Sequence, residues 1–212
     1  MTASDPRAAT ARSASGDACS VPAAFPASMP ETDGDLSLSF RAADEDDTDA
    51  LLTLEERCFP GDSWSREALR SHLASDCGRA LLCFAGEVCV GEMLFTVIPP
   101  EWEILRVATR PDFRRRGIGR ALMEGLHAAV EAAGCTDGFL EVRASGAAAQ
   151  ALYEQTGYRR TGLRRRYYRS PVEDAVLMHR HTDLKTGAAE ATPTADTAKK
   201  ADVTETAEKN SR

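Results

Sequence analysis

The run Arg114-Arg115-Arg116-Gly117-Ile118-Gly119 stands between a strand-like apolar segment and an amphipathic, helix-like segment. Arg-x-x-Gly-x-Gly in this setting directs backbone N–H groups and the positive end of a helix toward one point, which favours binding of a pyrophosphate. Downstream, Glu141 ends a short predicted strand, and Tyr153 follows on a predicted helix. A carboxylate and a phenol near one anion site suit a reaction that removes one proton and delivers another.

Charge is divided unevenly along the chain, whose formal net charge is −7. Residues 35–104 hold 15 acidic residues and 5 arginines, whereas residues 105–181 hold 8 acidic residues and 14 arginines. The second half would therefore face an anion such as a polyphosphate, unless its arginines are only solvated or paired with acids of the first half. The overall acidity, without interleaved aromatic and basic residues, argues against a nucleic-acid partner.

The composition predicts one folded domain between two disordered ends. Residues 1–34 are mostly Ala, Ser, Pro and Thr, and residues 182–212 are rich in Ala, Thr, Glu and Lys, so neither end can bury enough apolar surface to fold. We therefore predict a leader (1–34), a domain (35–181) and a tail (182–212). The chain lacks an apolar run of membrane-spanning length, and its six cysteines show no CxxC spacing, which indicates a cytoplasmic protein with reduced thiols.

Apolar periodicity predicts an α/β domain with the element order β-α-α-β-β-β-α-β-α-β-β. Strand-helix-strand units beside hairpins indicate a mixed central sheet flanked by helices. The expected strands are residues 36–42, 80–84, 88–98, 102–108, 139–142, 158–168 and 174–178. The expected helices are residues 44–58, 65–74, 118–133 and 147–155.

This ordered set of motifs resembles the GNAT superfamily of N-acetyltransferases, whose signature is Arg/Gln-x-x-Gly-x-Gly/Ala before a helix. Within the superfamily, residues 36–180 are similar to the RimI-type ribosomal-protein alanine N-acetyltransferases. The similarity rests on residues 140–145 (LEVRAS), 151–158 (ALYEQTGY), 166–168 (RYY) and 174–178 (DAVLM), and on Phe59-Pro60 with Trp64-Ser65. The resemblance implies a GNAT-like fold with acetyl-coenzyme A as co-substrate.

The resemblance also implies roles for individual residues. Glu141 would be the general base that takes a proton from the acceptor ammonium, and Tyr153 the general acid for the departing thiolate. The residues implied for binding the pantetheine arm are Val107, Ala108 and Thr109. Those implied for the pyrophosphate are Arg115, Arg116, Gly117, Ile118, Gly119 and Arg120. Gly146 stands where the family commonly has Asn, so no cofactor contact is carried over to it.

The implied reaction is direct acetyl transfer to a protein N-terminal α-amino group, and a ribosomal protein is the acceptor that the resemblance suggests. Two alternatives stay open: an acetyltransferase for lysine side chains or a small amine, and a non-catalytic acyl-coenzyme A binding module. Cys89 and Cys135 lack sequence neighbours that would activate them as nucleophiles. His179 and His181 have no third ligand nearby in sequence, so no metal site is expected.

Each motif also has a purely structural interpretation. Gly117 could serve a tight turn, Glu141 could pair with an arginine such as Arg143, and Tyr153 could be a core residue. The aromatic residues that could either wall an acceptor pocket or only pack are Phe59, Trp64, Tyr167 and Tyr168.

Overall fold

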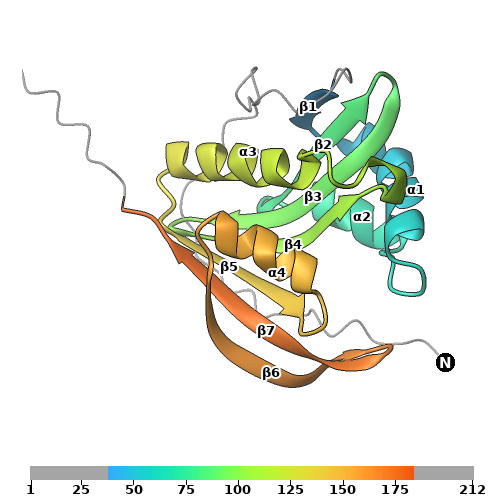
Figure 1. Cartoon of the computed structure of the whole chain (residues 1–212). Helices are drawn as coiled ribbons and strands as arrows, with labels where there is room; N and C mark the ends of the chain where they lie inside the picture. The colour runs from blue at the N-terminus through green and yellow to red at the C-terminus, as the bar shows by residue number, and fades with distance from the viewer. Residues whose placement is uncertain (1–37, 184–212) are drawn as a thin grey trace, which may run out of the picture.

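In the computed structural model residues 38–183 are described, and their strands and helices follow the predicted order (Figure 1). The strands are β1 (Leu38–Ala42), β2 (Gly78–Ala85), β3 (Val88–Ile98), β4 (Glu101–Thr109), β5 (Asp137–Arg143), β6 (Arg159–Arg169) and β7 (Val172–His181). The helices are α1 (Thr48–Cys58), α2 (Arg66–Leu73), α3 (Ile118–Ala132) and α4 (Ala147–Gln155), with short 3-10 turns at Glu45–Asp47 and Pro111–Phe113. The predicted leader and nearly all of the predicted tail lie outside the described residues.

Local capping explains where the first two helices begin. Asp44 and Asp47 form a reciprocal capping box at the turn that leads into α1. The Ser65 hydroxyl accepts a hydrogen bond from the Ala68 N–H at 3.2 Å, as expected for the predicted N-cap of α2. Because each cap satisfies N–H groups that the first turn leaves unpaired, the sequence marks these starts clearly.

The strands form one mixed sheet in the order β1-β2-β3-β4-β5-β7-β6. β4 and β5 are parallel and are joined by a crossover through α3, whereas the other described neighbours pair antiparallel. The predicted last strand, 174–178, is too short. β7 extends to His181 because it pairs on both sides, with β5 and with β6.

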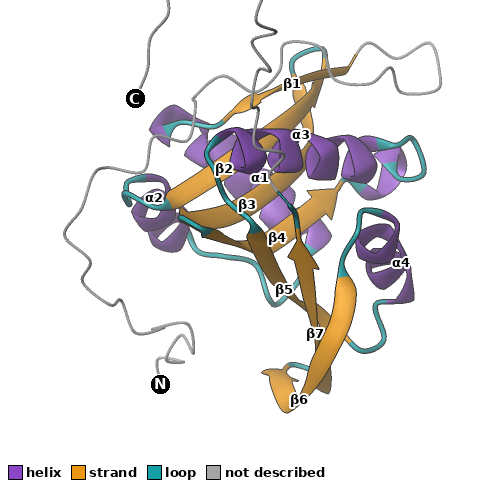
Figure 2. Cartoon of the chain, turned by 90° about the vertical axis from the view of Figure 1, so that its left-hand side faces the viewer, coloured by secondary structure: helices purple, strands orange, loops and turns teal. Residues whose placement is uncertain are grey.

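Helices cover the two faces of the sheet unequally (Figures 1 and 2). α3 and α4 share the larger core with one face, where Leu122, Leu126 and Phe95 are fully buried. α1 and α2 pack on the other face through a smaller core around Leu51 and Leu69, over β2 to β4. Among the described elements, none of the helices covers the β5-β7-β6 part of that second face.

The five cysteines within the described part are free thiols, and Cys83 and Cys135 are buried among them. Across the described part, none of the helices is long and apolar enough to cross a membrane.

Candidate active site

The loop before α3 presents backbone N–H groups to one side. Arg115 and Gly117 both have left-handed backbone conformations, with φ angles of 67° and 81°. Gly117 is the N-cap residue of α3 and no side chain caps this helix end, so the first N–H groups of α3 are left for a ligand or for water. Together with the positive end of the helix dipole, these groups favour a negative charge at the start of α3.

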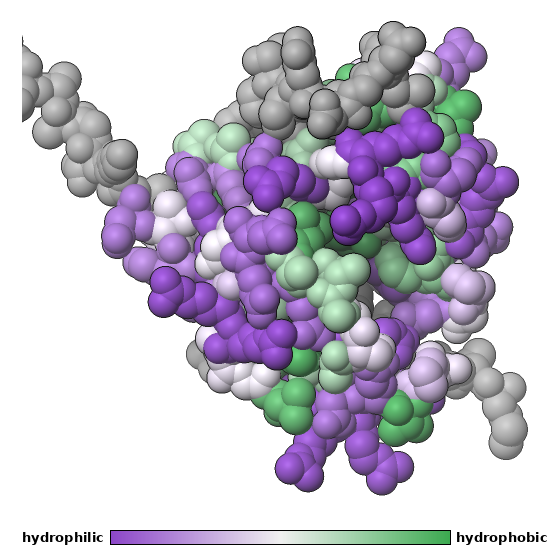
Figure 3. All heavy atoms as spheres, viewed as in Figure 1, coloured by the Kyte–Doolittle hydropathy of each residue, from purple (hydrophilic) through white to green (hydrophobic). Residues whose placement is uncertain are grey.

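This loop lines a cavity of about 500 Å³ between the end of β4, the start of α3 and helix α4. We call it the first cavity. The predicted cofactor residues that line it are Val107, Ala108, Thr109, Arg115, Gly117, Ile118, Gly119 and Arg120. Arg116 is not among its lining residues, and its guanidinium lies 5.1 Å from the ring centre of Phe113. On the molecular face that carries α3 and α4, apolar side chains gather near the middle within a hydrophilic surround (Figure 3).

Tyr153 lines the first cavity from α4. Its side chain is buried, and burial raises the pKa of its phenol above the ordinary value. The neighbouring ring of Tyr158 lies 6.1 Å away between centres. Tyr158 accepts a hydrogen bond from Trp102 Nε1 at 3.0 Å within the core. Of these two phenols, Tyr158 is therefore engaged in the core, and Tyr153 is the one that reaches the cavity.

Glu141 lies on the opposite face of the sheet from Tyr153. The prediction that it ends its strand is wrong, because pairing with β7 extends β5 to Arg143. Leu140 and Val142 belong to the core that packs against α3 and α4. Since side chains alternate along a strand, Glu141 points to the other face and lines a second cavity of about 530 Å³. The residues implied as base and acid, Glu141 and Tyr153, therefore lie on opposite faces of the sheet.

The Glu141 carboxylate pairs with Arg164 of β6, at 2.5 Å between Oε1 and Nη1. The expected alternative partner, Arg143, pairs instead with Asp62 and Glu173, at 3.5 and 3.4 Å. The Glu141 side chain is 17% exposed and that of Arg164 is 55% exposed. The carboxylate is thus largely covered, while the guanidinium is open to solvent.

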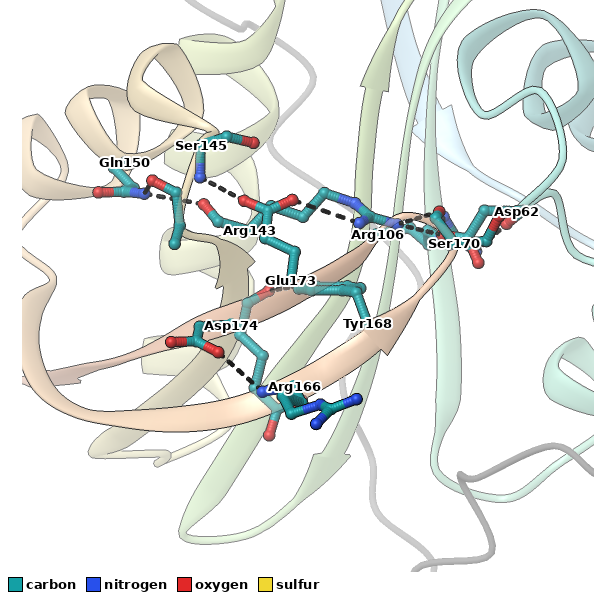
Figure 4. Close-up of polar contacts among 12 residues, drawn as sticks. Asp62, Arg106, Arg143, Ser145, Gln150, Arg166, Tyr168, Ser170, Glu173 and Asp174 are labelled. Atoms are coloured by element: carbon teal, nitrogen blue, oxygen red, sulfur yellow. Dashed lines mark hydrogen bonds and ion pairs between the residues drawn. The ribbon is translucent and has the colours of Figure 1, made fainter.

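The loop between α1 and α2 closes over the place where β4 and β5 separate. The two strands pair as far as Ile104 and Leu140 and then diverge. Arg106 of β4 and Arg143 of β5 lie beyond that point, and each lies 3.5 Å from the Asp62 carboxylate (Figure 4). Asp62 therefore ties the loop to both diverging strands.

Side chains beneath the α1–α2 loop also anchor it to the core. Glu55 of α1 is fully buried, accepts a hydrogen bond from the Trp64 N–H at 2.8 Å and lies 3.6 Å from Arg106 Nε. The Trp64 ring packs edge-on against His72, which agrees with a loop-anchoring role. Phe59 lies under the Arg106 guanidinium at 4.4 Å and also lines the first cavity.

Cys58 also lines the first cavity, although no sequence motif marks it. Burial raises the pKa of its thiol and nearby Glu92 raises it further, so the thiol stays protonated at neutral pH. Burial also raises the pKa of Cys89 to about 12. Cys135 is buried in the core. These surroundings favour none of the three as a thiolate nucleophile.

Comparison with known proteins places the chain in a family. Residues 48–158 match the Acetyltransferase (GNAT) family. The "[Ribosomal protein bS18]-alanine N-acetyltransferase" of Salmonella typhimurium is 45% identical over 84 residues, which are 39% of this chain and 57% of the relative. The "N-alpha-acetyltransferase RimI" of Mycobacterium tuberculosis is 36% identical over 139 residues, 63% of this chain and 86% of the relative.

A solved structure agrees with these relatives. The ribosomal-protein-S18-alanine N-acetyltransferase from Escherichia coli superposes with a TM-score of 0.64 at 30% identity, covering 68% of this chain and 94% of that one. The sequence match to the Salmonella relative spans little more than half of that protein's length. The family match covers over half of this chain, and both sequence and fold agree with it: the chain belongs to the GNAT acetyltransferase family.

Proposed function

We propose that this protein transfers an acetyl group from acetyl-coenzyme A to the N-terminal α-amino group of a protein. One observation carries the proposal. Tyr153 and Glu141 line cavities on opposite faces of the sheet, next to the point where β4 and β5 stop pairing. Strands that separate at this point would let a thioester on one side meet an amine on the other, with Tyr153 as the proton donor and Glu141 as the proton acceptor.

The residues of the first cavity fit coenzyme A. The uncapped start of α3 and the left-handed backbone at Arg115 and Gly117 offer N–H groups to a pyrophosphate. Past Ile104, the β5 side of β4 is without its strand partner, so backbone groups near Val107–Thr109 can bind the amides of a pantetheine arm. When bound, acetyl-coenzyme A supplies an activated acetyl group with a thiolate as leaving group.

Glu141 and Tyr153 then divide the proton transfers between them. The Glu141 carboxylate accepts a proton from the incoming ammonium, which frees the lone pair for attack. Because burial holds the proton on Tyr153, its phenol is protonated at neutral pH and can donate that proton to the departing thiolate. With Cys58 protonated, the arrangement favours direct transfer over a covalent thioester on the protein.

The acceptor is proposed from chemistry and from the relatives' names. An α-amine has an ordinary pKa of about 8 and a lysine side chain one of about 10.4, so a terminal amine gives up its proton far more readily to a carboxylate. The Salmonella relative is named for the alanine of ribosomal protein bS18. We infer that an N-terminal alanine of a ribosomal protein is the natural acceptor and that the protein works in the cytoplasm.

Labelled acetyl-coenzyme A and a set of peptides test this proposal. The peptides begin with Ala, Ser, Glu or Pro, and each carries one internal lysine. We expect label on the α-amine of the Ala peptide, located by tandem mass spectrometry. Label on the lysine would favour the alternative lysine acetyltransferase. Tight binding of acetyl-coenzyme A without transfer to any peptide would favour the non-catalytic binding module.

A further inference from the structure

Arg164 reaches the Glu141 carboxylate from the edge of the sheet. β6 is the edge strand, and β7 lies between it and β5. Glu141 stands opposite Leu177, which in turn stands opposite Gly162. Arg164 lies two residues past Gly162, so its side chain must extend over β7. A β-carbon at Gly162 would lie 3.3 Å from Leu177 Cδ1, so glycine avoids a tight contact there.

The backbone around Arg164 is shaped to direct that side chain. The register between β6 and β7 shifts between Arg164 and Tyr168. Arg166 has a φ of 51°, and its N–H donates a hydrogen bond to Asp174 Oδ1 at 2.8 Å (Figure 4). The Arg164 guanidinium lies 5.1 Å from the ring centre of Tyr167. An irregular strand segment and an aromatic ring therefore support the guanidinium beside its carboxylate.

Few charged groups of the described residues face Glu141. Those that line its cavity are Glu101 and Glu103 from β4 and Arg164 from β6. Arg143, next on the same face of β5, is already paired with two other carboxylates. β7 contributes uncharged side chains to the lining. Within this set, Arg164 is the cation that neutralises Glu141.

An ammonium group and a guanidinium meet a carboxylate in the same way, because each brings one positive charge and N–H donors. With an ordinary pKa of about 8, an α-amine arrives at neutral pH mostly as ammonium. Resting on the proposed function, we propose that Arg164 occupies the place of the acceptor ammonium on Glu141 and yields it when the peptide binds. Arg164 is then a positioning residue that holds the carboxylate between turnovers. Acetylation removes the charge of the amine, so the product cannot compete and the ion pair re-forms.

Steady-state kinetics on three variants test this role. Arg164→Gln removes the competing cation, and Arg164→Lys retains one. Arg160→Gln is the matched control, because Arg160 lies on the same strand, is similarly exposed and pairs with Glu154 instead. Since exposed pairs are weak, we expect Arg164→Gln to lower the KM for the acceptor peptide by up to about fivefold, with kcat within about twofold. Arg164→Lys and Arg160→Gln should resemble the parent.

The KM for the acceptor peptide decides the outcome. An unchanged or raised KM in Arg164→Gln would overturn the proposal, as would Lys and Gln variants that behave alike. A parent protein that acetylates no peptide refutes the proposed function itself. An active parent with either overturning result refutes only the role of Arg164.

Discussion

The two cavities on either side of the sheet are built in different ways. The first cavity uses backbone N–H groups, a glycine-containing loop and small α4 side chains such as Ala148 and Ala151. The second uses charged side chains on separate strands, with Glu103, Glu141 and Arg164 in its lining. A cavity of the first kind suits one fixed ligand. In a cavity of the second kind, substitution of the charged side chains can change which ligand fits.

The largest expected effect is a loss of turnover, caused by a substitution in the second cavity alone. Glu141→Gln should lower turnover by about 10²-fold or more, because it removes the general base. Calorimetry should show unchanged affinity for acetyl-coenzyme A, since the first cavity lies on the other face. Glu103→Gln is the matched control, as it removes another carboxylate from the same cavity. If Glu141→Gln keeps turnover within about twofold of the parent, Glu141 is not the base.

A pair of tyrosine variants separates chemistry from packing in the first cavity. Tyr153→Phe should lower kcat by about tenfold or more and leave the KM for the peptide little changed, because the hydroxyl acts mainly in the transition state. Tyr158→Phe leaves the buried Trp102 N–H without its acceptor, at a cost of about 1–3 kcal/mol in unfolding free energy. Its Tm should fall by several degrees with kcat retained. If Tyr153→Phe instead kept its kcat and lost several degrees in Tm, Tyr153 would have no part in the mechanism.

A substitution that crowds the backbone N–H groups at the start of α3 tests the proposed pyrophosphate site. Gly117→Val should weaken binding of acetyl-coenzyme A by about tenfold, because a β-branched side chain is strained at its φ of 81° and crowds the N–H groups. Gly86→Val is the control. Gly86 also has a positive φ, and a β-carbon there would meet no atom within 4 Å. Calorimetry on folded proteins should show loss of affinity in Gly117→Val alone, and equal affinities in both variants would refute the site.

The smallest expected effect concerns the core behind Tyr153. Burial lowers the pKa of His127 to about 3, and its ring packs between Trp102 and Tyr158. The unfolded chain, with an ordinary pKa of about 6.5, binds the proton more readily, so stability is lost as pH falls from about 6.5 toward 3. At pH 5.5 this loss amounts to about 1.4 kcal/mol relative to pH 7.5.

Urea unfolding at pH 7.5 and 5.5 isolates that contribution. His127→Met puts an apolar side chain that cannot ionise in the place of the imidazole. This variant should therefore lose less stability on acidification than the parent does. Equal losses in the two proteins would show that His127 does not titrate as its burial requires.

The same contrast explains what the sequence could predict. The first cavity draws on one continuous strand-loop-helix segment, residues 107–120, whose residue types specify its local geometry. The sequence marks Glu141 and Tyr153 as candidates but not the faces they occupy, because the face of a strand residue depends on which helices pack against its neighbours. The contact with Arg164 depends on the register of three strands and on the left-handed Arg166. Asp62 likewise meets two arginines distant in sequence. Short-range patterns do not encode such contacts.

Cofactor and acceptor should approach from opposite faces of the sheet and meet where β4 and β5 diverge. A crystal structure of Glu141→Gln with coenzyme A and an Ala-first peptide tests it most directly. We predict the pantetheine arm along Val107–Thr109 beside Tyr153, and the peptide amine within hydrogen-bond distance of the substituted side chain at position 141, with Arg164 displaced. Both ligands in one cavity, or a peptide terminus far from residue 141, would contradict the account.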